Sequence, residues 1–306
     1  MKSYVKVSAP ASIANFGPGF DTFGMALEEP RDVIELTLDV YETEIETVPD
    51  YSIPTKKNAA FAAANAIAWK NRVNSPFHMK ITKGVRPGSG IGSSAASSVG
   101  AALAMAVAMD YEAKDEEIIQ ASSLGEKMAS GSAHIDNVTA SLLGGFTIVS
   151  SRNPVDVISI PVERLPKFDI VVTLPDVVLE TRKSRSVLPR QVPLTDAVEN
   201  ISYCSTIVHS MLDRNIEKVG KYLNDAVVLP YRKQLMPWYD RVMKAATGAG
   251  AIGFSVSGAG PAVFAICIEN ARKVAAEMEK AFKAAGFKSQ SIITKPGKGA
   301  EVLTVK

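Results

Sequence analysis

The sequence has few of the residues that build disulfide frameworks or metal clusters. Its 306 residues include only two cysteines, Cys204 and Cys267, and neither has a cysteine or histidine nearby at metal-ligand spacing. A disulfide scaffold and a structural zinc site are therefore not expected, and a reducing compartment such as the cytoplasm is. The net charge of +2 does not favour binding to nucleic acid or an acidic membrane surface, so any basic site must be local.

Signals for secretion and membrane insertion are also missing. The N-terminal stretch has no apolar core of the kind that a signal peptide contains. The segment 87–109 carries no charge and is long enough to cross a bilayer, which needs about 20 residues. Its first half is glycine and serine and its second half is mostly alanine, so it would gain little from lipid. There is no internal repeat and no low-complexity tail.

The uncharged segment begins with PGSGIGSSAASS, which lies between an alternating strand pattern, PFHMKITKGV, and an apolar helix pattern over 93–109. Ser93 and Ser94 stand where a helix N-cap belongs. A helix N-terminus presents free N–H groups, and glycines let the backbone close around a ligand. This order of strand, glycine loop and helix predicts a phosphate site; the alternative is a helix that packs through its small residues.

Two familiar phosphate loops do not fit. The pattern G-x-x-x-x-G-K-[ST] needs a lysine where Ser93 follows Gly92. The dinucleotide fingerprint G-x-G-x-x-G needs a glycine at position 93, and no βαβ pattern surrounds the loop.

Two more glycine-bearing stretches accompany this loop: PASIANFGPGFDTFGMAL at 10–27 and FSVSGAGPAVFAI at 254–266. In this order, the three stretches resemble the GHMP family of small-molecule kinases. The central one is similar to the family's P-x-x-x-G-[LI]-G-S-S-A-[AS] nucleotide loop and the last to its S-G-x-G-P loop, with Ala259 where serine is common. The segments SGSAHIDNV, TRKSR and LPYRKQLMP resemble the family's homoserine branch, and the likeness covers essentially the whole chain.

The pattern of elements predicts an α+β fold with helices on antiparallel sheets. We expect strands at 3–8, 33–39, 169–174, 252–257, 262–268 and 288–293, and helices at 58–73, 93–109, 115–130, 195–213, 216–225, 237–247 and 270–285. The resemblance implies two domains, 1–165 with an S5-like ATP-binding fold and 166–306 with a ferredoxin-like fold, and an active site in the cleft between them. It also implies a homodimer.

The resemblance implies ATP-dependent phosphorylation of the homoserine hydroxyl, with Mg²⁺. Ser94 and Glu126 would hold the metal; for Glu126 the alternative is an exposed helix residue. Asn58 would touch the adenine side or serve only as an N-cap. The residues expected to bind the nucleotide are Pro87, Gly88, Ser89, Gly90, Ile91, Gly92, Ser93, Ser94 and Asn58.

The substrate presents a carboxylate, an ammonium and a hydroxyl. Arg185 and Arg232 are expected to clamp the carboxylate, and Asp21 to accept from the ammonium. The alternatives are a solvated Arg185 and an Asp21 that bonds its own turn. The residues expected to bind substrate are Asn15, Asp21, His134, Asp136, Asn137, Thr181, Arg185, Arg232, Gly258 and Gly260, and those expected to act in catalysis are Asn137, His134 and Glu126. His134 has the chemistry of a general base, but we expect it to bind substrate while catalysis rests mainly on positioning.

Two rival functions stay open from the sequence. One is a sister kinase acting on mevalonate, shikimate or a sugar; mevalonate and shikimate lack the ammonium that Asp21 would recognise. The other is an inactive protein of the same fold that binds a nucleotide or metabolite.

Overall fold

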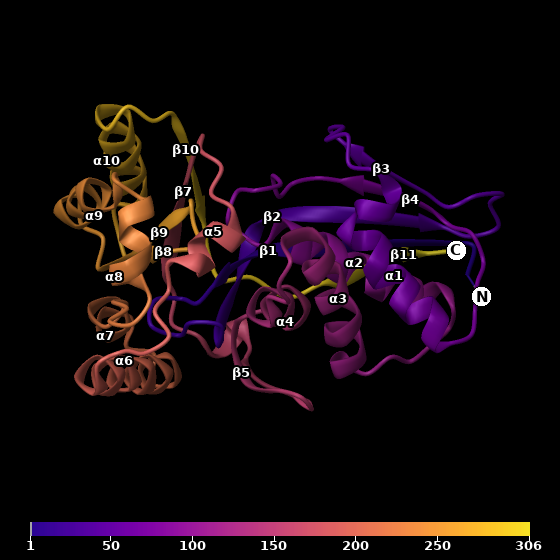
Figure 1. Cartoon of the computed structure of the whole chain (residues 1–306), viewed down its shortest axis with the longest axis horizontal. Helices are drawn as coiled ribbons and strands as arrows, with labels where there is room; N and C mark the ends of the chain where they lie inside the picture. Colours follow the sequence, from indigo (N-terminus) through magenta and orange to yellow (C-terminus); the bar gives the residue numbers. More distant parts are fainter. Residues whose placement is uncertain (1) are drawn as a thin grey trace.

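The computed structural model of the chain describes residues 2–306 and contains two β-sheets, each covered by helices (Figure 1). The first sheet has seven strands, with β5 (Phe146–Arg152) pairing with β2 and β6 (Val155–Ile160) pairing with β5. The main path runs β11 (Glu301–Val305), β1 (Tyr4–Ala14), β2 (Phe23–Thr37), β4 (His78–Thr82) and β3 (Glu44–Val48). Its pairs are antiparallel except β3 with β4.

One layer of helices covers this sheet: α1 (Ala59–Lys70), α2 (Ser93–Ala108), α3 (Asp115–Ser130) and α4 (Ile135–Leu143). The small residues of α2 let it approach the strands closely. A Cβ atom at Gly100 would overlap the Ile34 side chain on β2 and lie 3.5 Å from Ala9 on β1. The alanine-rich part of the uncharged segment is therefore a tightly packed core helix, and the glycine-rich part precedes it as a loop.

The second sheet has the order β10 (Ser289–Thr294), β7 (Asp169–Pro175), β9 (Val263–Cys267) and β8 (Gly253–Val256), all antiparallel. The helices α9 (Tyr239–Gly248) and α10 (Ala271–Ala284) pack against it, while α6 (Leu194–Leu212) and α7 (Ile216–Lys221) lie at its lower end in Figure 1. Of the two short helices, α5 (Thr181–Ser186) lies on the side of the second sheet that faces the first, and α8 (Leu229–Arg232) lies between α7 and α9 in Figure 1. The predicted α+β fold with antiparallel sheets is confirmed.

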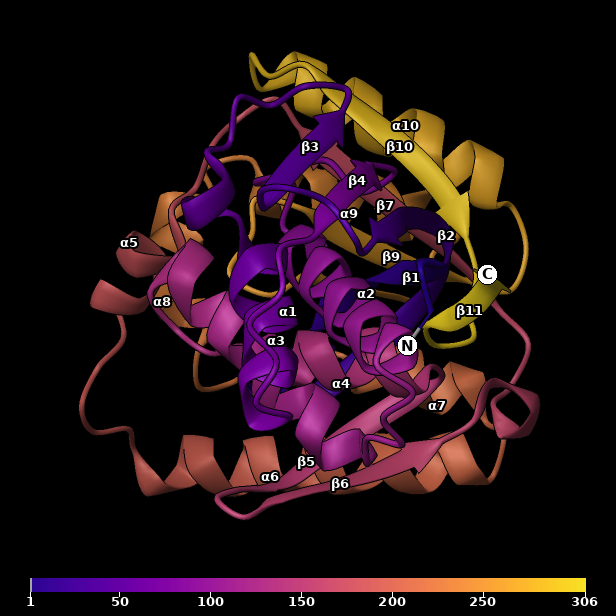
Figure 2. The same ribbon diagram turned by 90° about the vertical axis from the view of Figure 1, so that its right-hand side faces the viewer.

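The two ends of the chain lie side by side, as Figures 1 and 2 both show. Tyr4 and Lys306 exchange backbone hydrogen bonds there, because β11 returns from the second sheet to the edge of the first. The division into domains 1–165 and 166–306 stays a prediction. Strand β11 belongs to the second of these ranges but pairs with β1, which belongs to the first.

Several predicted elements differ in extent. Strands 3–8 and 33–39 continue as the longer β1 and β2, and the helix predicted at 216–225 ends at Lys221. Asp225 accounts for the early end, because its carboxylate accepts the backbone N–H groups of Val227, Val228 and Leu229 in a separate turn. The sequence reading missed β3, α4, β6, α5, α8 and β11. Within 2–306, no helix combines the length and apolar character needed to cross a membrane.

Candidate active site

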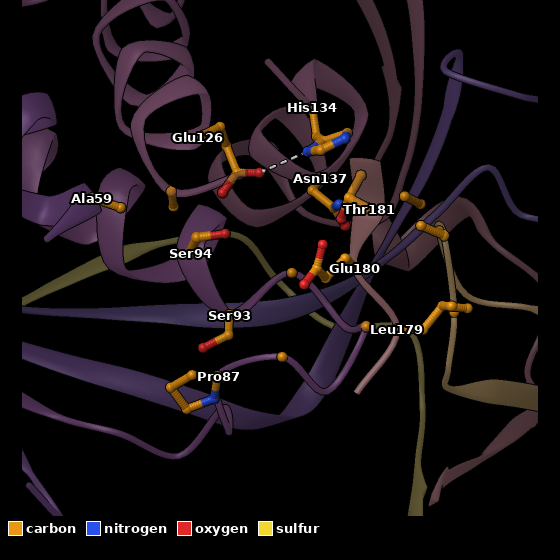
Figure 3. Close-up of a pocket in the computed structure, with 18 of the residues that line it drawn as sticks. Ala59, Pro87, Ser93, Ser94, Glu126, His134, Asn137, Leu179, Glu180 and Thr181 are labelled. Carbon is orange, nitrogen blue, oxygen red and sulfur yellow. Dashed lines mark hydrogen bonds and ion pairs between the residues drawn. The ribbon is translucent and has the colours of Figure 1, made fainter. Parts of the chain in front are cut away.

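A cavity of about 570 Å³ lies where the two sheets meet (Figure 3). Its walls come from the end of β1, the glycine loop 87–92, helices α2 to α5, and the turn 258–260 between β8 and β9. All the predicted site residues line it except Ser89 and Ile91, whose side chains are buried elsewhere in the loop. The fold therefore gathers into one cavity residues that span the chain from Asn15 to Gly260.

The glycine loop is built from left-handed backbone. Gly88, Gly90 and Gly92 have φ values of 72°, 85° and 70°, which favour glycine. Gly90 also packs on the second glycine turn: a Cβ atom there would lie 2.8 Å from the Gly260 carbonyl oxygen, and Ser257 donates a 2.7 Å hydrogen bond to the Gly90 carbonyl. Two glycine motifs far apart in sequence thus form one surface.

The predicted serine N-cap is wrong. Gly92 is the N-cap of α2, and no side chain caps this helix. Ser93 instead donates a 2.6 Å hydrogen bond to the Val85 carbonyl, a partner that lies on the other side of the loop. Ser94 lines the cavity, as Figure 3 shows. The first turn of α2 therefore has no side-chain cap and faces the cavity with its partial positive charge, which suits a phosphate.

A buried ion pair supports the glycine loop. Lys83 and Asp32 form it with side chains 4% and 0% exposed. Lys83 also donates to Ser97 Oγ at 2.9 Å and the Ser93 carbonyl at 3.1 Å, and Asp32 accepts from the Val85 N–H at 3.0 Å. Burial lowers the pKa of Lys83, against the opposing charge of Asp32. This network joins β2, the start of the loop and the first turn of α2.

Glu126 on α3 contradicts the alternative of an exposed helix residue, because its side chain is only 2% exposed. It faces the cavity near Ser94 and pairs with His134, whose Nδ1 lies 3.1 Å from Glu126 Oε2 (Figure 3). Burial disfavours a charged imidazole, but the hydrogen bond and charge of Glu126 outweigh it and raise the pKa of His134. A buried carboxylate beside a hydroxyl oxygen fits Mg²⁺, which prefers oxygen ligands and uses few from the protein when phosphates supply others.

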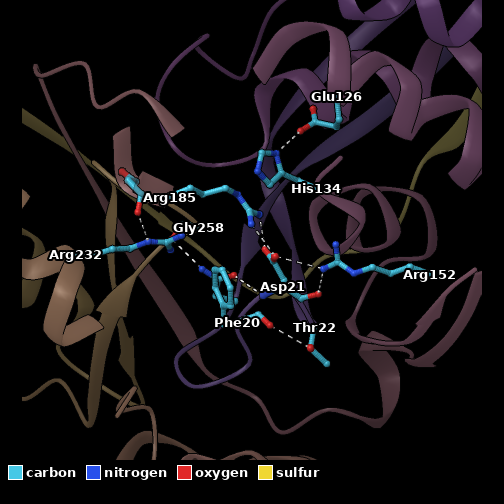
Figure 4. Close-up of polar contacts among 11 residues, drawn as sticks. Phe20, Asp21, Thr22, Glu126, His134, Arg152, Arg185, Arg232 and Gly258 are labelled. Carbon is cyan, nitrogen blue, oxygen red and sulfur yellow. Dashed lines mark hydrogen bonds and ion pairs between the residues drawn. The ribbon is translucent and has the colours of Figure 1, made fainter. Parts of the chain in front are cut away.

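Asp21 and Arg185 bind each other directly, so neither alternative reading of these two residues holds. Two guanidinium nitrogens of Arg185 donate to the two carboxylate oxygens of Asp21 at 2.7 and 3.0 Å. Arg152, which the sequence reading missed, reaches the same carboxylate at 3.5 Å (Figure 4). Asp21 is left-handed at φ 55°, and Asn15 Oδ1 accepts its N–H at 3.0 Å.

Arg232 lies beside this pair and is 4% exposed. It donates to the Gly258 carbonyl at 2.9 Å and to the Ser184 carbonyl at 3.3 Å, and its guanidinium carbon is 5.0 Å from the centre of the Phe20 ring. Burial, together with the charge of Arg185, lowers the pKa of Arg232 to about 10. Two arginines thus face one corner of the cavity, and Phe20 contacts both.

The remaining predicted residues lie between the arginines and the loop. Asn137 accepts from Ser12 Oγ at 2.9 Å, and a Cβ atom at Gly92 would lie 3.0 Å from Asn137 Oδ1, so the amide abuts the loop. Asp136 is buried; its burial, with the charge of Asp21, raises its pKa to about 6. Asn58 caps α1 through its side chain, which accepts from the Ala60 N–H at 3.0 Å, and it also lines the cavity.

Beyond Arg152, the sequence reading missed several residues that line the cavity, among them Thr47, Ile53, Lys57 and Lys83. Of these four, only Lys83 carried a signal, as a lysine four positions before the glycine loop begins at Pro87. The others lie on β3 and the segment after it, which the sequence pattern did not predict.

The fold and the cavity define the class of protein: a two-sheet, small-molecule kinase whose cavity combines a glycine loop with a charged corner. The profile of the GHMP kinases N terminal domain matches residues 58–145, and that of the GHMP kinases C terminal matches 207–284. The chain is 46% identical to the homoserine kinase of Pyrococcus furiosus, over 97% of this chain and 99% of that one, and 45% identical to that of Thermococcus gammatolerans, over 97% and 99%. The chain therefore belongs to the GHMP kinase family.

Solved structures have the same fold. The crystal structure of homoserine kinase from Cytophaga hutchinsonii superposes with a TM-score of 0.90 at 33% identity, covering 99% of this chain and 98% of that one. The L. major mevalonate kinase superposes with a TM-score of 0.74 at 18% identity, covering 98% and 99%, and this likeness shows the fold alone.

Proposed function

We propose that the chain is an ATP-dependent homoserine kinase, which transfers the γ-phosphoryl group of ATP to the side-chain hydroxyl of L-homoserine. The product is O-phospho-L-homoserine, and we assign the reaction to threonine biosynthesis in the cytoplasm. The observation that carries the acceptor is the pairing of Asp21 with Arg185 next to Arg232, because these charges complement a free amino acid. The homoserine kinases to which the chain is similar support the same acceptor.

In this proposal the phosphates of ATP lie against the glycine loop. The N–H groups of the first turn of α2, including that of Ser93, and the hydroxyl of Ser94 surround that position, and the helix dipole favours negative charge there. Asn58 and the segment around Lys57 form the adenine side of the cavity.

Mg²⁺ would be held by Ser94 and Glu126, and it would neutralise negative charge on the phosphates during transfer. The support is the buried position of the Glu126 carboxylate beside Ser94. The Glu126–His134 contact then orients the carboxylate from its other side.

The acceptor binds by exchanging ion pairs. Its carboxylate replaces Asp21 as the partner of Arg185 and is also met by Arg232; its ammonium replaces Arg185 as the partner of Asp21. One internal pair is lost and three intermolecular pairs form, two to the carboxylate and one to the ammonium. No charge is then left buried without a partner, which is the costly outcome. The exchange favours a zwitterion over an acceptor with only a carboxylate.

Catalysis rests on positioning, since phosphoryl transfer needs little covalent help from the protein. Asn137 adjoins the loop at Gly92 and would orient the hydroxyl toward the phosphate. His134, tied to Glu126, would contact the acceptor. Asn15, Asp136 and Thr181 complete the acceptor side, with the turn at Gly258 and Gly260.

A coupled kinase assay with a panel of acceptors tests the proposal. Homoserine should be phosphorylated, whereas 4-hydroxybutyrate, which lacks the amine, should lose at least about 30-fold in kcat/KM. Asp21→Asn should shrink that preference by harming homoserine most. Efficient phosphorylation of mevalonate or shikimate, with none of homoserine, would assign the chain to a sister kinase, and no turnover of any acceptor would indicate a binding protein.

We also propose a homodimer. Helix α6 exposes Leu194, Val198, Ile201 and Leu212 at helical spacing along one face, with exposed fractions of 52% to 78%. An exposed apolar face of this kind is typical of an interaction surface. Sedimentation of the protein and of Ile201→Asp tests this: the variant should be monomeric if α6 forms the interface.

A further inference from the structure

Arg152 is the last residue of β5 and lies at the hairpin that leads into β6. It approaches Asp21 from the side opposite Arg185, as Figure 4 shows. Its Nη2 donates a 2.7 Å hydrogen bond to the Asp21 carbonyl and lies 3.5 Å from the Asp21 carboxylate. Arg152 therefore contacts both the backbone and the side chain of Asp21.

Asp21 needs such support because its backbone is strained. Asn15, Phe16 and Asp21 all have positive φ, at 68°, 40° and 55°, within one loop. Left-handed backbone is unfavourable for residues other than glycine and persists only where the surroundings hold it. Asn15 holds the N–H of Asp21 and Arg152 holds its carbonyl, so the two contacts fix the peptide units on both sides of its Cα.

Arg152 becomes important when the substrate binds and the ion pairs are exchanged. Once Arg185 turns to a substrate carboxylate, the Asp21 carboxylate loses its two short hydrogen bonds. We propose that Arg152 is a positioning residue that then keeps Asp21 aimed at the substrate ammonium. This inference rests on the proposed function, because it requires an acceptor with an amine.

The geometry of Arg152 suits this role better than a direct role in binding substrate. Its short hydrogen bond goes to the backbone, and its longer contact of 3.5 Å leaves the carboxylate oxygens able to accept from another donor. Its side chain is 46% exposed, so solvent screens its charge and limits competition with the ammonium.

The test compares Arg152→Met with Arg152→Lys and wild type in the same coupled assay. Arg152→Met should raise the KM for homoserine about five- to tenfold, as expected for one hydrogen bond, and leave the KM for ATP within about twofold. The preference for homoserine over 4-hydroxybutyrate in kcat/KM should fall by a similar factor. Arg152→Lys should recover part of the preference, because it keeps the charge and one donor.

Arg241→Met is the matched control, since Arg241 also donates to a backbone carbonyl, that of Ala284, but on the outer helices α9 and α10. Arg241→Met should have the same KM values and the same preference for homoserine as wild type. Melting temperatures identify variants that are only destabilised, and the acceptor ratio does not depend on the folded fraction. An unchanged ratio in Arg152→Met overturns the inference and leaves the proposed function standing. A wild-type enzyme without preference for homoserine overturns both.

Discussion

Removing the ammonium of Lys83 should destabilise the fold and loosen the nucleotide loop. The substitution Lys83→Met keeps most of the aliphatic stem and leaves Asp32, whose side chain is completely buried, without its cation. Asp32 would still accept from the Val85 N–H at 3.0 Å and from Ser97 Oγ at 2.9 Å. The ammonium's bonds to Ser97 and to the Ser93 carbonyl would be lost as well.

The magnitude follows from that geometry. Breaking a buried ion pair by removing one partner costs about 3–5 kcal/mol. Because Asp32 keeps two donors, we expect the lower end, about 3 kcal/mol in the free energy of unfolding. Removing the stranded charge as well, in Lys83→Met/Asp32→Asn, should recover about 2 kcal/mol, since an uncompensated buried charge is the main cost. The KM for ATP should rise more than that for homoserine, because the network joins both ends of the loop.

Urea unfolding followed by circular dichroism measures the free energy of unfolding of wild type, the two single variants and the double variant. A coupled assay gives the KM values. Lys298→Met is the control: Lys298 pairs with Glu163 at 3.9 Å with both side chains exposed, and such pairs contribute about 1 kcal/mol or less. A loss below about 1 kcal/mol for Lys83→Met, or an additive double variant, would refute the reasoning.

Three further predictions concern the cavity. Ser94→Ala should raise the Mg²⁺ concentration for half-maximal rate about tenfold and leave the melting temperature nearly unchanged, because Ser94 does not cap α2; an unchanged Mg²⁺ titration would remove the metal role. Arg232→Ala should raise the KM for homoserine about 10- to 150-fold and that for ATP far less; equal effects on both would place Arg232 outside the acceptor site. Asp136→Asn should stabilise the protein at pH 7. Burial raises the pKa of Asp136 to about 6, from 3.8, so ionisation costs up to about 3 kcal/mol above pH 6 and nothing below pH 4. Urea midpoints at pH 4, 5 and 7 should show the gain disappearing as the pH falls, and a gain that is constant with pH would contradict the assigned cause.

The sequence by itself determined the features that depend on neighbours in the chain. The glycine loop, the helix over 115–130 and the Asn58 cap were all predicted and are present, because backbone freedom, helical periodicity and capping act over a few residues. The fold class followed for the same reason. The likeness to the GHMP kinases predicted roles for Glu126 and Arg185, which charge patterns alone assigned to a solvated surface.

Only the tertiary structure decided which charges meet. Arg185 and Asp21 are 164 positions apart, and Arg152 and Asp21 are 131 apart. The partner of Ser93 is Val85 across the loop, and β11 pairs with β1 at the other end of the chain. A residue's local sequence encodes its backbone preference and its charge. The partner of that charge depends on how the sheets pack, because long side chains reach only what the fold brings within a few ångströms.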